Sequence, residues 1–180
     1  MGLDAHVLVL GGRRSGKSRY AESLVLGSGL APVYVATATP GDEEMKERIA
    51  AHRDRRGAGW RTLEAPVLLA DAVAGAATAA NAVLVDCLTL WLANLMEADF
   101  DIGTETATLM ATLEKAAGPV VLVSNEVGSG VVPDNALARR YSDAHGILNQ
   151  RVAAAVGRVV LMTAGLPLRL KPSPQGNITL

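Results

Sequence analysis

A phosphate-binding loop is the first segment of the chain whose residue types and spacing predict chemistry. It matches the pattern G-x-x-x-x-G-K-[ST] and consists of Gly11, Gly12, Arg13, Arg14, Ser15, Gly16, Lys17 and Ser18. Its glycines let backbone N–H groups curl around phosphate oxygens, and a helix starting near Gly16 points its positive end at them. Lys17 is expected to reach the β- and γ-phosphates as a catalytic residue. The segment therefore predicts a nucleoside triphosphate site rather than a glycine-rich turn without a ligand.

A phosphate loop of this kind works with an acidic side chain at the end of another strand, which helps to hold Mg²⁺. Asp86 ends the apolar run Val83–Val85 and is the best candidate. A strand that ends in Asp is weak evidence alone, since many strands reach a turn this way. Together with the phosphate loop it becomes informative, so Ser18 and Asp86 are the predicted Mg²⁺-binding residues.

The segment at residues 42–56 reads DEEMKERIAAHRDRR and is not explained by a generic phosphate loop. Its acids precede its bases, which complements a helix dipole and would account for most such helices. The sharper observation is that Arg48, His52 and Arg55 share one helix face at i, i+4 and i+7 spacing. Nearby arginines disfavour imidazolium, so His52 is predicted to be neutral and nucleophilic. The same arginines could bind a triphosphate and stabilise charge developing on it.

A second unusual stretch, Ser124–Pro133, directly follows an expected strand and contains two glycines. It is long for a strand-to-helix connection and lies at the expected ligand-binding edge. Asn125 and Glu126 are presented there, although a plain connection remains the alternative interpretation. No general base for a kinase reaction can be named from the sequence, and Glu126 is a guess.

Three other potentially reactive side chains are interpreted as structural. Cys87 is expected to be small and buried rather than nucleophilic, because no neighbouring group is arranged to lower its pKa. His6, in an expected strand, and His145, in an expected helix, lack the arginine-rich surroundings of His52.

These residues need a sheet to position them, and five nearly continuous apolar runs predict its strands: His6–Leu10, Val33–Thr37, Ala82–Asp86, Val120–Ser124 and Arg158–Met162. Segments with helical spacing lie between them, at about residues 16–26, 42–55, 67–79, 88–98, 105–116 and 136–156. This alternation predicts an α/β fold with a mostly parallel central sheet flanked by helices. Residues 165–171 are expected to add an edge strand, and residues 99–104 to form an exposed loop. Residues 1–171 are interpreted as a single domain followed by a tail at 172–180.

Composition excludes several classes of function. The 180 residues carry 17 basic and 18 acidic side chains, and only 3% are aromatic, which argues against a nucleic-acid partner. No apolar stretch approaches a membrane span, and the N-terminus does not match a signal peptide. One cysteine rules out an internal disulfide framework and, with these absences, predicts a cytoplasmic protein.

A family resemblance covers about residues 7–171. The chain resembles the bifunctional adenosylcobinamide kinase/adenosylcobinamide-phosphate guanylyltransferases of cobalamin biosynthesis through motifs that occur in one order: GGRRSGKS, VYVATA, RIAAHRDRR, the W-R-T-x-E of residues 60–64, VLVDCLTLWLAN, VSNEVGSGVVP, GILNQRVA and GLPLRLK. The histidine segment and the NEVGxGxVP loop are much more specific than the phosphate loop.

The resemblance implies a RecA-like P-loop NTPase fold and two reactions with Mg²⁺. ATP or GTP would phosphorylate adenosylcobinamide, and GMP from GTP would then be transferred to the product through a guanylylated histidine, releasing pyrophosphate and giving adenosylcobinamide-GDP. The RIxxHRxxR pattern places the histidine role on His52. The resemblance also implies a trimer. Its implied nucleotide-binding positions beyond the phosphate loop are Ala36, Thr37, Ala38, Arg53, Asp54, Arg55, Arg56, Glu64 and Asp86.

Two alternatives remain open at the level of sequence. One is a P-loop small-molecule kinase without guanylyl transfer, in which His52 only binds phosphate. The other is a nucleotide-dependent switch or assembly protein, against which stands the absence of an N/T-K-x-D guanine-reading motif. The sequence does not assign the corrinoid contacts, the preferred phosphate donor or the distance of His52 from the phosphate loop.

Overall fold

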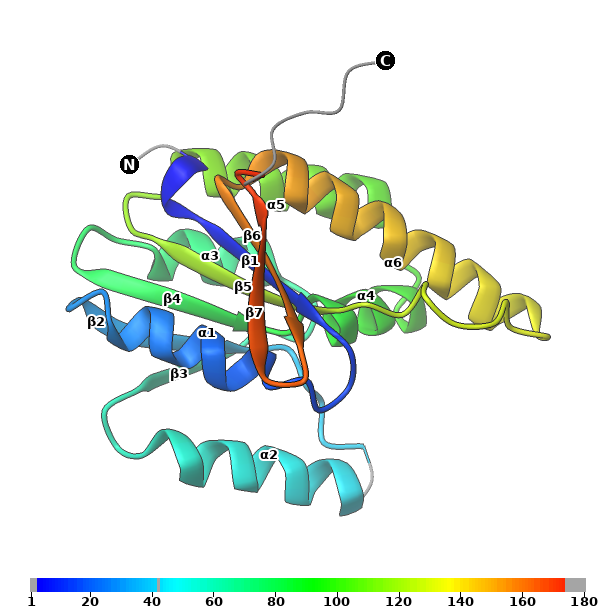
Figure 1. Cartoon of the computed structure of the whole chain (residues 1–180), viewed down its shortest axis with the longest axis horizontal. Helices are drawn as coiled ribbons and strands as arrows, with labels where there is room; N and C mark the ends of the chain where they lie inside the picture. Colours follow the sequence, from blue (N-terminus) through cyan, green and yellow to red (C-terminus); the bar gives the residue numbers. More distant parts are fainter. Residues whose placement is uncertain (1–2, 42, 174–180) are drawn as a thin grey trace.

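The computed structural model describes residues 3–41 and 43–173, and the strands among them form one sheet (Figure 1). The strands are β1 (Val7–Gly11), β2 (Ala31–Ala36), β3 (Arg61–Glu64), β4 (Asn81–Asp86), β5 (Val120–Asn125), β6 (Arg158–Thr163) and β7 (Leu166–Lys171). Their order is β3-β2-β4-β5-β1-β6-β7, and every neighbouring pair is parallel except the antiparallel pair β6–β7. The carboxyl ends of the first six strands therefore meet at one edge.

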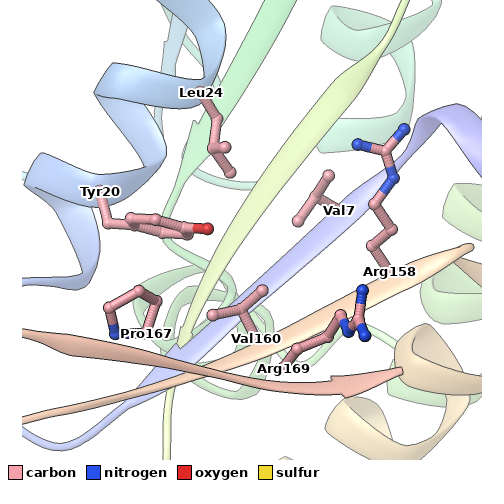
Figure 2. A pocket seen from close by; sticks show the side chains of 7 residues that line it. All are labelled: Val7, Tyr20, Leu24, Arg158, Val160, Pro167 and Arg169. Carbon is pink, nitrogen blue, oxygen red and sulfur yellow. The ribbon is translucent and has the colours of Figure 1, made fainter. Parts of the chain in front are cut away.

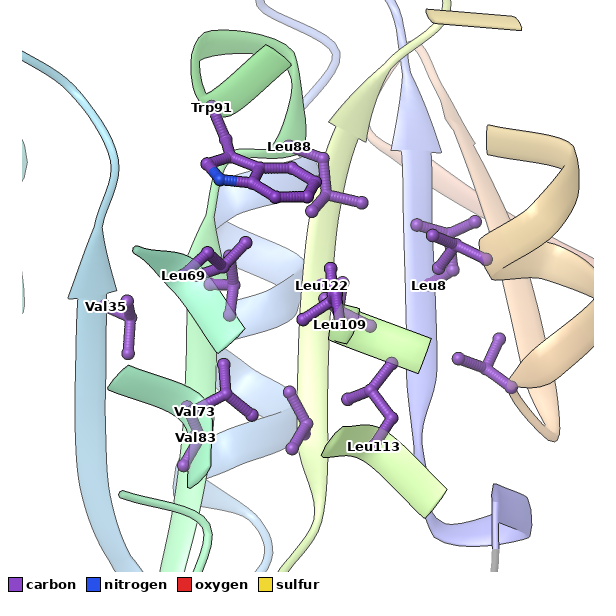
Figure 3. Packing of buried hydrophobic residues seen from close by; sticks show 14 of the residues in the cluster. Leu8, Val35, Leu69, Val73, Val83, Leu88, Trp91, Leu109, Leu113 and Leu122 are labelled. Atoms are coloured by element: carbon purple, nitrogen blue, oxygen red, sulfur yellow. The ribbon is translucent and has the colours of Figure 1, made fainter. Parts of the chain in front are cut away.

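Helices cover both faces of the sheet. They are α1 (Lys17–Leu26), α2 (Glu43–Arg56), α3 (Leu69–Ala76), α4 (Leu88–Glu97), α5 (Ile102–Lys115) and α6 (Ala136–Ala155), after a short 3₁₀ turn at Leu3–Ala5. Side chains from α3, α4, α5 and α6 share one apolar cluster with the sheet, part of which Figure 3 shows around Trp91 and Leu122. A second cluster lies on the opposite face under α1. Figure 1 shows α2 set apart from both layers.

The strand predictions are confirmed to within two residues at each end. Continuous Val- and Leu-rich runs are buried on both faces, as β1 and β4 show, and this double burial is what produces runs without alternation. The edge strand β7 is also confirmed. Pro167 is tolerated there because an edge strand needs fewer ladder donors.

One strand is not predicted from the sequence, and one expected loop is wrong. The sequence does not indicate strand β3, because its four residues RTLE are exposed or half-buried at the sheet edge and form no apolar run. The loop expected at 99–104 ends early, since α5 begins at Ile102. The Asp101 side chain accepts a hydrogen bond from the Thr104 N–H at 2.6 Å, which caps the helix and starts it there. No helix in the described part of the chain is long and apolar enough to cross a membrane.

Two histidines, His6 and His145, are buried, and the ring of His6 links the start of β1 to the start of β5. His6 accepts a hydrogen bond at Nδ1 from the Val120 N–H (3.1 Å), and its Nε2 lies 2.9 Å from the Leu113 carbonyl oxygen. A ring that accepts at one nitrogen and donates at the other must be neutral. Burial lowers the pKa of both His6 and His145 from the ordinary 6.5.

These lowered pKa values predict how stability depends on pH. The unfolded chain binds protons at a higher pH than the buried rings do, so the free energy of unfolding should fall as the pH drops below about 6.5. Each unit of pKa depression removes about 1.4 kcal/mol. Urea unfolding at neutral and mildly acidic pH measures this loss. His6→Gln should reduce it, and an unchanged pH dependence in that variant would contradict the prediction.

Candidate active site

The phosphate loop connects β1 to α1, and its first glycine is required by close packing. A Cβ at Gly11 would lie 2.5 Å from Ser15 Oγ and 2.7 Å from the Met162 carbonyl oxygen, so no larger residue fits without a shift. Gly16 has φ +91°, a left-handed conformation that favours glycine. Glycine is therefore needed at these positions both for space and for backbone conformation.

The loop leaves the start of α1 available to a ligand. Gly16 precedes the helix without a side-chain cap, whereas Asp101 and Asn135 cap α5 and α6. Uncapped N–H groups at a helix start are the donors that phosphates use. Lys17 Nζ donates a hydrogen bond to the Gly12 carbonyl oxygen at 3.0 Å, so the lysine lies across the loop that would hold the phosphates.

Four of the predicted site residues, on strands β3, β2, β4 and β1, lie at the carboxyl edge of the sheet. Ala36 of β2 is in register with Glu64 of β3 on one side and Asp86 of β4 on the other, while Gly11 of β1 is in register with Asn125 of β5. The residues two positions earlier on four of these strands belong to the apolar cluster under α1: Tyr34, Leu84, Val9 and Val123. Because strand side chains alternate between faces, Ala36, Asp86, Gly11 and Asn125 lie on the α1 face as well.

Three buried side-chain atoms among the described residues have no hydrogen-bond partner. They are Ser15 Oγ in the phosphate loop, Asp86 Oδ2 at the end of β4 and Arg56 Nη1 at the end of α2. Buried polar atoms are nearly always paired, and unpaired ones call for an explanation such as a missing ion or ligand. A hydroxyl, a carboxylate and a guanidinium are groups that a phosphate–metal complex would satisfy.

The Asp86 carboxylate acts together with burial on the pKa values of two neighbouring groups. Burial and the nearby Asp86 carboxylate raise the pKa of Tyr34, and the same two causes raise the pKa of Cys87 to about 11. The thiol is thus protonated and buried, in agreement with its interpretation as a structural residue. A carboxylate that perturbs its neighbours and keeps one oxygen unpartnered fits a cation ligand.

The fully buried Thr37 makes two hydrogen bonds with the backbone of Cys87, the residue after Asp86. The Thr37 hydroxyl accepts from the Cys87 N–H and donates to the Cys87 carbonyl oxygen, both at 2.7 Å. Asn94 of α4 donates to the carbonyl oxygens of Thr37 and Pro66, each at 2.8 Å. The residues after β2 are thereby tied to α4, which gives Asn94 a structural role in that helix.

Helix α2 contacts the sheet through its C-terminal end. The Arg56 guanidinium lies over the Tyr34 ring, 3.4 Å from its centroid, and Trp60 meets the same ring edge-on at 6.3 Å. His52 lies one turn before Arg56 and therefore shares its helix face. Both are half-buried, whereas Arg53 and Asp54 are exposed. The face of α2 that carries His52 is thus the face turned toward β2.

The remaining predicted residues divide into exposed and partly covered groups. Arg13, Arg14 and Glu64 are exposed, and Ser18 and Ala38 are half-buried. The side chains of Arg48 and Arg55 lie outside the described residues, as do Asp42 and residues 174–180 of the tail.

Three residues of the site, Tyr34, Trp60 and Asn94, have no role predicted from the sequence. Their positions within the quoted VYVATA, W-R-T-x-E and VLVDCLTLWLAN motifs were the available signal.

A separate cavity of about 230 Å³ lies between α1 and the β6–β7 hairpin (Figure 2). Its lining reaches from Val7 and Arg158, which begin their strands, to Pro167, which pairs with Met162 near the end of β6. Its lining consists of Val7, Tyr20, Leu24, Arg158, Val160, Pro167 and Arg169. None of the predicted site residues is among them.

Comparisons with known proteins concern the family of the chain. A family model described as cobinamide kinase / cobinamide phosphate guanyltransferase matches residues 7–170. The bifunctional adenosylcobalamin biosynthesis protein CobP of Pseudomonas aeruginosa is 52% identical over 169 residues, which cover 93% of this chain and 98% of the relative.

Solved structures support the fold. The flagellar accessory protein FlaH of Methanocaldococcus jannaschii has a TM-score of 0.55 at 13% identity, covering 92% of this chain and 77% of its own. An ATPase from a type III secretion system of pathogenic bacteria has a TM-score of 0.54 at 12% identity, covering 88% and 51%. These likenesses concern the fold alone, and they confirm the expected RecA-like P-loop class.

The family match extends over the phosphate loop, the histidine helix and the acidic strand end. The chain belongs to the cobinamide kinase / cobinamide phosphate guanyltransferase family, the bifunctional kinases and guanylyltransferases of cobalamin biosynthesis.

Proposed function

We propose that the carboxyl edge of the sheet binds the nucleotide for both reactions, and that His52 carries the guanylyl group in the second. The observation that carries this proposal is the set of three unpartnered buried atoms on Ser15, Asp86 and Arg56. They belong to the phosphate loop, the end of β4 and the helix that bears His52. In this proposal residues 1–171 act as one catalytic domain.

In the kinase step, the phosphate loop and the start of α1 hold ATP or GTP, and Lys17 turns from the Gly12 carbonyl oxygen toward the β- and γ-phosphates. The hydroxyl of adenosylcobinamide attacks the γ-phosphorus, the bond between that phosphorus and the β–γ bridging oxygen breaks, and ADP or GDP leaves while the hydroxyl proton passes to solvent water. Lys17 acts by positioning and by offsetting charge, which is the main contribution a protein makes to phosphoryl transfer.

The residues present fit Mg²⁺. Magnesium sites use one or two protein oxygens together with substrate phosphates, and no group of three or more His, Cys, Asp or Glu among the described residues forms a closed metal site. Ser18 and Asp86 would hold the ion, with the unpartnered Asp86 oxygen as the anionic ligand. When bound, Mg²⁺ offsets the negative charge of the phosphates.

In the transfer step, an unprotonated ring nitrogen of His52 attacks the α-phosphorus of GTP. A P–N bond forms, the bond between the α-phosphorus and the bridging oxygen breaks, and pyrophosphate leaves. An oxygen of adenosylcobinamide phosphate then attacks the same phosphorus and breaks the P–N bond, which restores neutral His52. A covalent intermediate divides one difficult transfer into two easier ones.

This role needs α2 to approach the phosphate loop. The described side chains of α2 apart from His52 and Arg56 are exposed, so few of these described side chains pack against the rest of the protein. Arg53, Asp54, Arg55 and Arg56 are proposed to line the nucleotide with Ala36, Thr37, Ala38 and Glu64. The hydroxyl of Thr37 is already hydrogen-bonded to the backbone of Cys87, so Thr37 would contribute by positioning the carboxyl edge of the sheet.

Incubation with GTP labelled at the α-phosphate tests the proposal. The protein should acquire a label that is labile in acid and stable in alkali, as a phosphoramidate is, and His52→Ala should remain unlabelled. Label discharged onto adenosylcobinamide phosphate, with pyrophosphate release, completes the cycle. An unlabelled wild-type protein that still phosphorylates adenosylcobinamide would favour a kinase in which His52 only binds phosphate.

The assembly is proposed to be a trimer, and the surface of β7 supports self-association. Leu166, Leu168 and Leu170 alternate along this edge strand and are 71%, 55% and 42% exposed. A row of exposed leucines is typical of an interface. Sedimentation at assay concentrations should show a trimer, and a monomer would contradict the proposal.

The single cysteine is a buried free thiol, which suits the cytoplasm as the proposed location.

A further inference from the structure

A closed network of polar side chains lies beneath the end of β5, next to the phosphate loop. Thr89, Ser124, His145 and Asn149 come from α4, β5 and α6, and all four are buried. Ser124 Oγ donates to Asn149 Oδ1 at 2.7 Å, and His145 Nε2 lies 3.2 Å from Thr89 Oγ1 and 3.3 Å from Ser124 Oγ. Such a buried polar network stabilises a structure only when its members are hydrogen-bonded, as they are here. A fully paired network makes the surrounding structure rigid, so we looked for the group that this one positions.

The network holds the main chain of Asn125 from both sides. The Asn125 N–H donates to Thr89 Oγ1 at 2.8 Å, and its carbonyl oxygen accepts from Asn149 Nδ2 at 3.0 Å. The next N–H, of Glu126, donates to the Gly11 carbonyl oxygen at 3.1 Å. The end of β5 is thereby fixed against the first residue of the phosphate loop.

The side chain of Asn125 is available for a ligand. Its amide makes no hydrogen bond with the described residues, and strand alternation places it on the α1 face with Asp86, between the strands of Asp86 and Gly11. An amide N–H at that position can donate to a phosphoryl oxygen as charge develops on it.

We propose that Asn125 contacts the transferring phosphoryl group in the kinase step, and that Thr89, His145 and Asn149 are positioning residues that aim it. This inference rests on the kinase role proposed for this edge of the sheet. His145 takes part as a neutral ring, which accepts from Asn149 Nδ2 at Nδ1 (3.4 Å) and donates from Nε2 toward Thr89. Tyr141 stacks on His145 and donates to the Thr89 carbonyl oxygen at 2.9 Å, which restricts both partners.

Steady-state kinetics of adenosylcobinamide phosphorylation test the inference on the full chain. Asn125→Ala should lower kcat by about 100-fold with little change in KM for ATP, because the contact is made to the transition state. Thr89→Val, which removes the hydroxyl at nearly constant volume, should lower kcat by about tenfold or more. Thr89→Ser, which keeps the hydroxyl, should restore it.

The combined variant Thr89→Val/Asn125→Ala separates positioning from general stability. If Thr89 acts through Asn125, the double variant should be no slower than Asn125→Ala alone. Multiplying effects would overturn the positioning role. His6→Gln is the matched control, since it alters a buried, hydrogen-bonded histidine at the opposite edge of the sheet and should leave kcat unchanged.

Failure of the inference is distinguishable from failure of the proposed site. If Lys17→Ala keeps full kinase activity, the kinase site is not at this edge, and both proposals fall. If Lys17→Ala is inactive while Asn125→Ala keeps wild-type kcat, the site stands and the role of Asn125 is wrong. The comparison of Thr89→Val with Thr89→Ser tests the positioning role without altering the buried His145 ring.

Discussion

His52→Ala should abolish guanylyl transfer while the kinase reaction continues at a rate within about threefold of wild type. The transfer loses its nucleophile, so we expect a decrease of at least about 1,000-fold, equivalent to about 4 kcal/mol of transition-state free energy. The kinase step uses the phosphate loop and Asp86 and does not need the imidazole. Separate assays of adenosylcobinamide phosphate formation and of pyrophosphate release measure the two activities.

A control on the same helix distinguishes loss of the nucleophile from disturbance of α2. Lys46 lies on α2 and forms an exposed ion pair with Glu43 at 2.6 Å, which contributes little to stability. Lys46→Ala should therefore leave both activities unchanged. Equal losses of both activities in His52→Ala would mean that the histidine serves binding or folding, and the proposed covalent role would be wrong.

Lys17→Ala should lower both activities, in contrast to His52→Ala. Removing a charge placed at the phosphates is expected to decrease kinase kcat by about 100- to 1,000-fold. Guanylyl transfer should also fall, because the proposal places GTP in the same phosphate loop. Initial rates for each reaction at saturating nucleotide measure the effect, and Ser23→Ala, farther along α1, is the matched control.

The pattern across these two variants tests whether one nucleotide site serves both reactions. A shared site predicts that Lys17→Ala affects both steps and that His52→Ala affects one. If Lys17→Ala impaired the kinase alone, GTP for the transfer would bind elsewhere, and the approach of α2 to the phosphate loop would not be required. The RecA-like fold itself would be unaffected by that result.

Much of the fold could be predicted because its signals are local. The phosphate loop is a contiguous motif, and double burial in a parallel sheet produces apolar runs that show where strands lie. Strand β3 could not be predicted because it is short and mostly polar, and among the described strands it pairs with β2 alone. The start of α5 depends on a cap at Asp101, which is a one-residue signal easily assigned to a loop.

The site could be predicted only in part, because its decisive contacts join distant segments. The sequence favours a structural role for His145, because it lacks the arginine-rich surroundings of His52. Its partners Thr89 and Ser124 are 56 and 21 residues away, so no local pattern shows that the three meet. The stacking of Arg56 on Tyr34 likewise joins α2 to β2 and has no counterpart in sequence spacing.

By itself the sequence determined the phosphate loop, the histidine–arginine segment and the parallel α/β class, because each is encoded in adjacent residues whose chemistry can be recognised in order. Only the tertiary structure decided which groups share the carboxyl edge. The strand order places β5 between β4 and β1, so Asn125 lies between Asp86 and Gly11 although the chain separates all three. Burial then determines which atoms remain unpartnered, since a polar atom finds its partners in space and not along the chain.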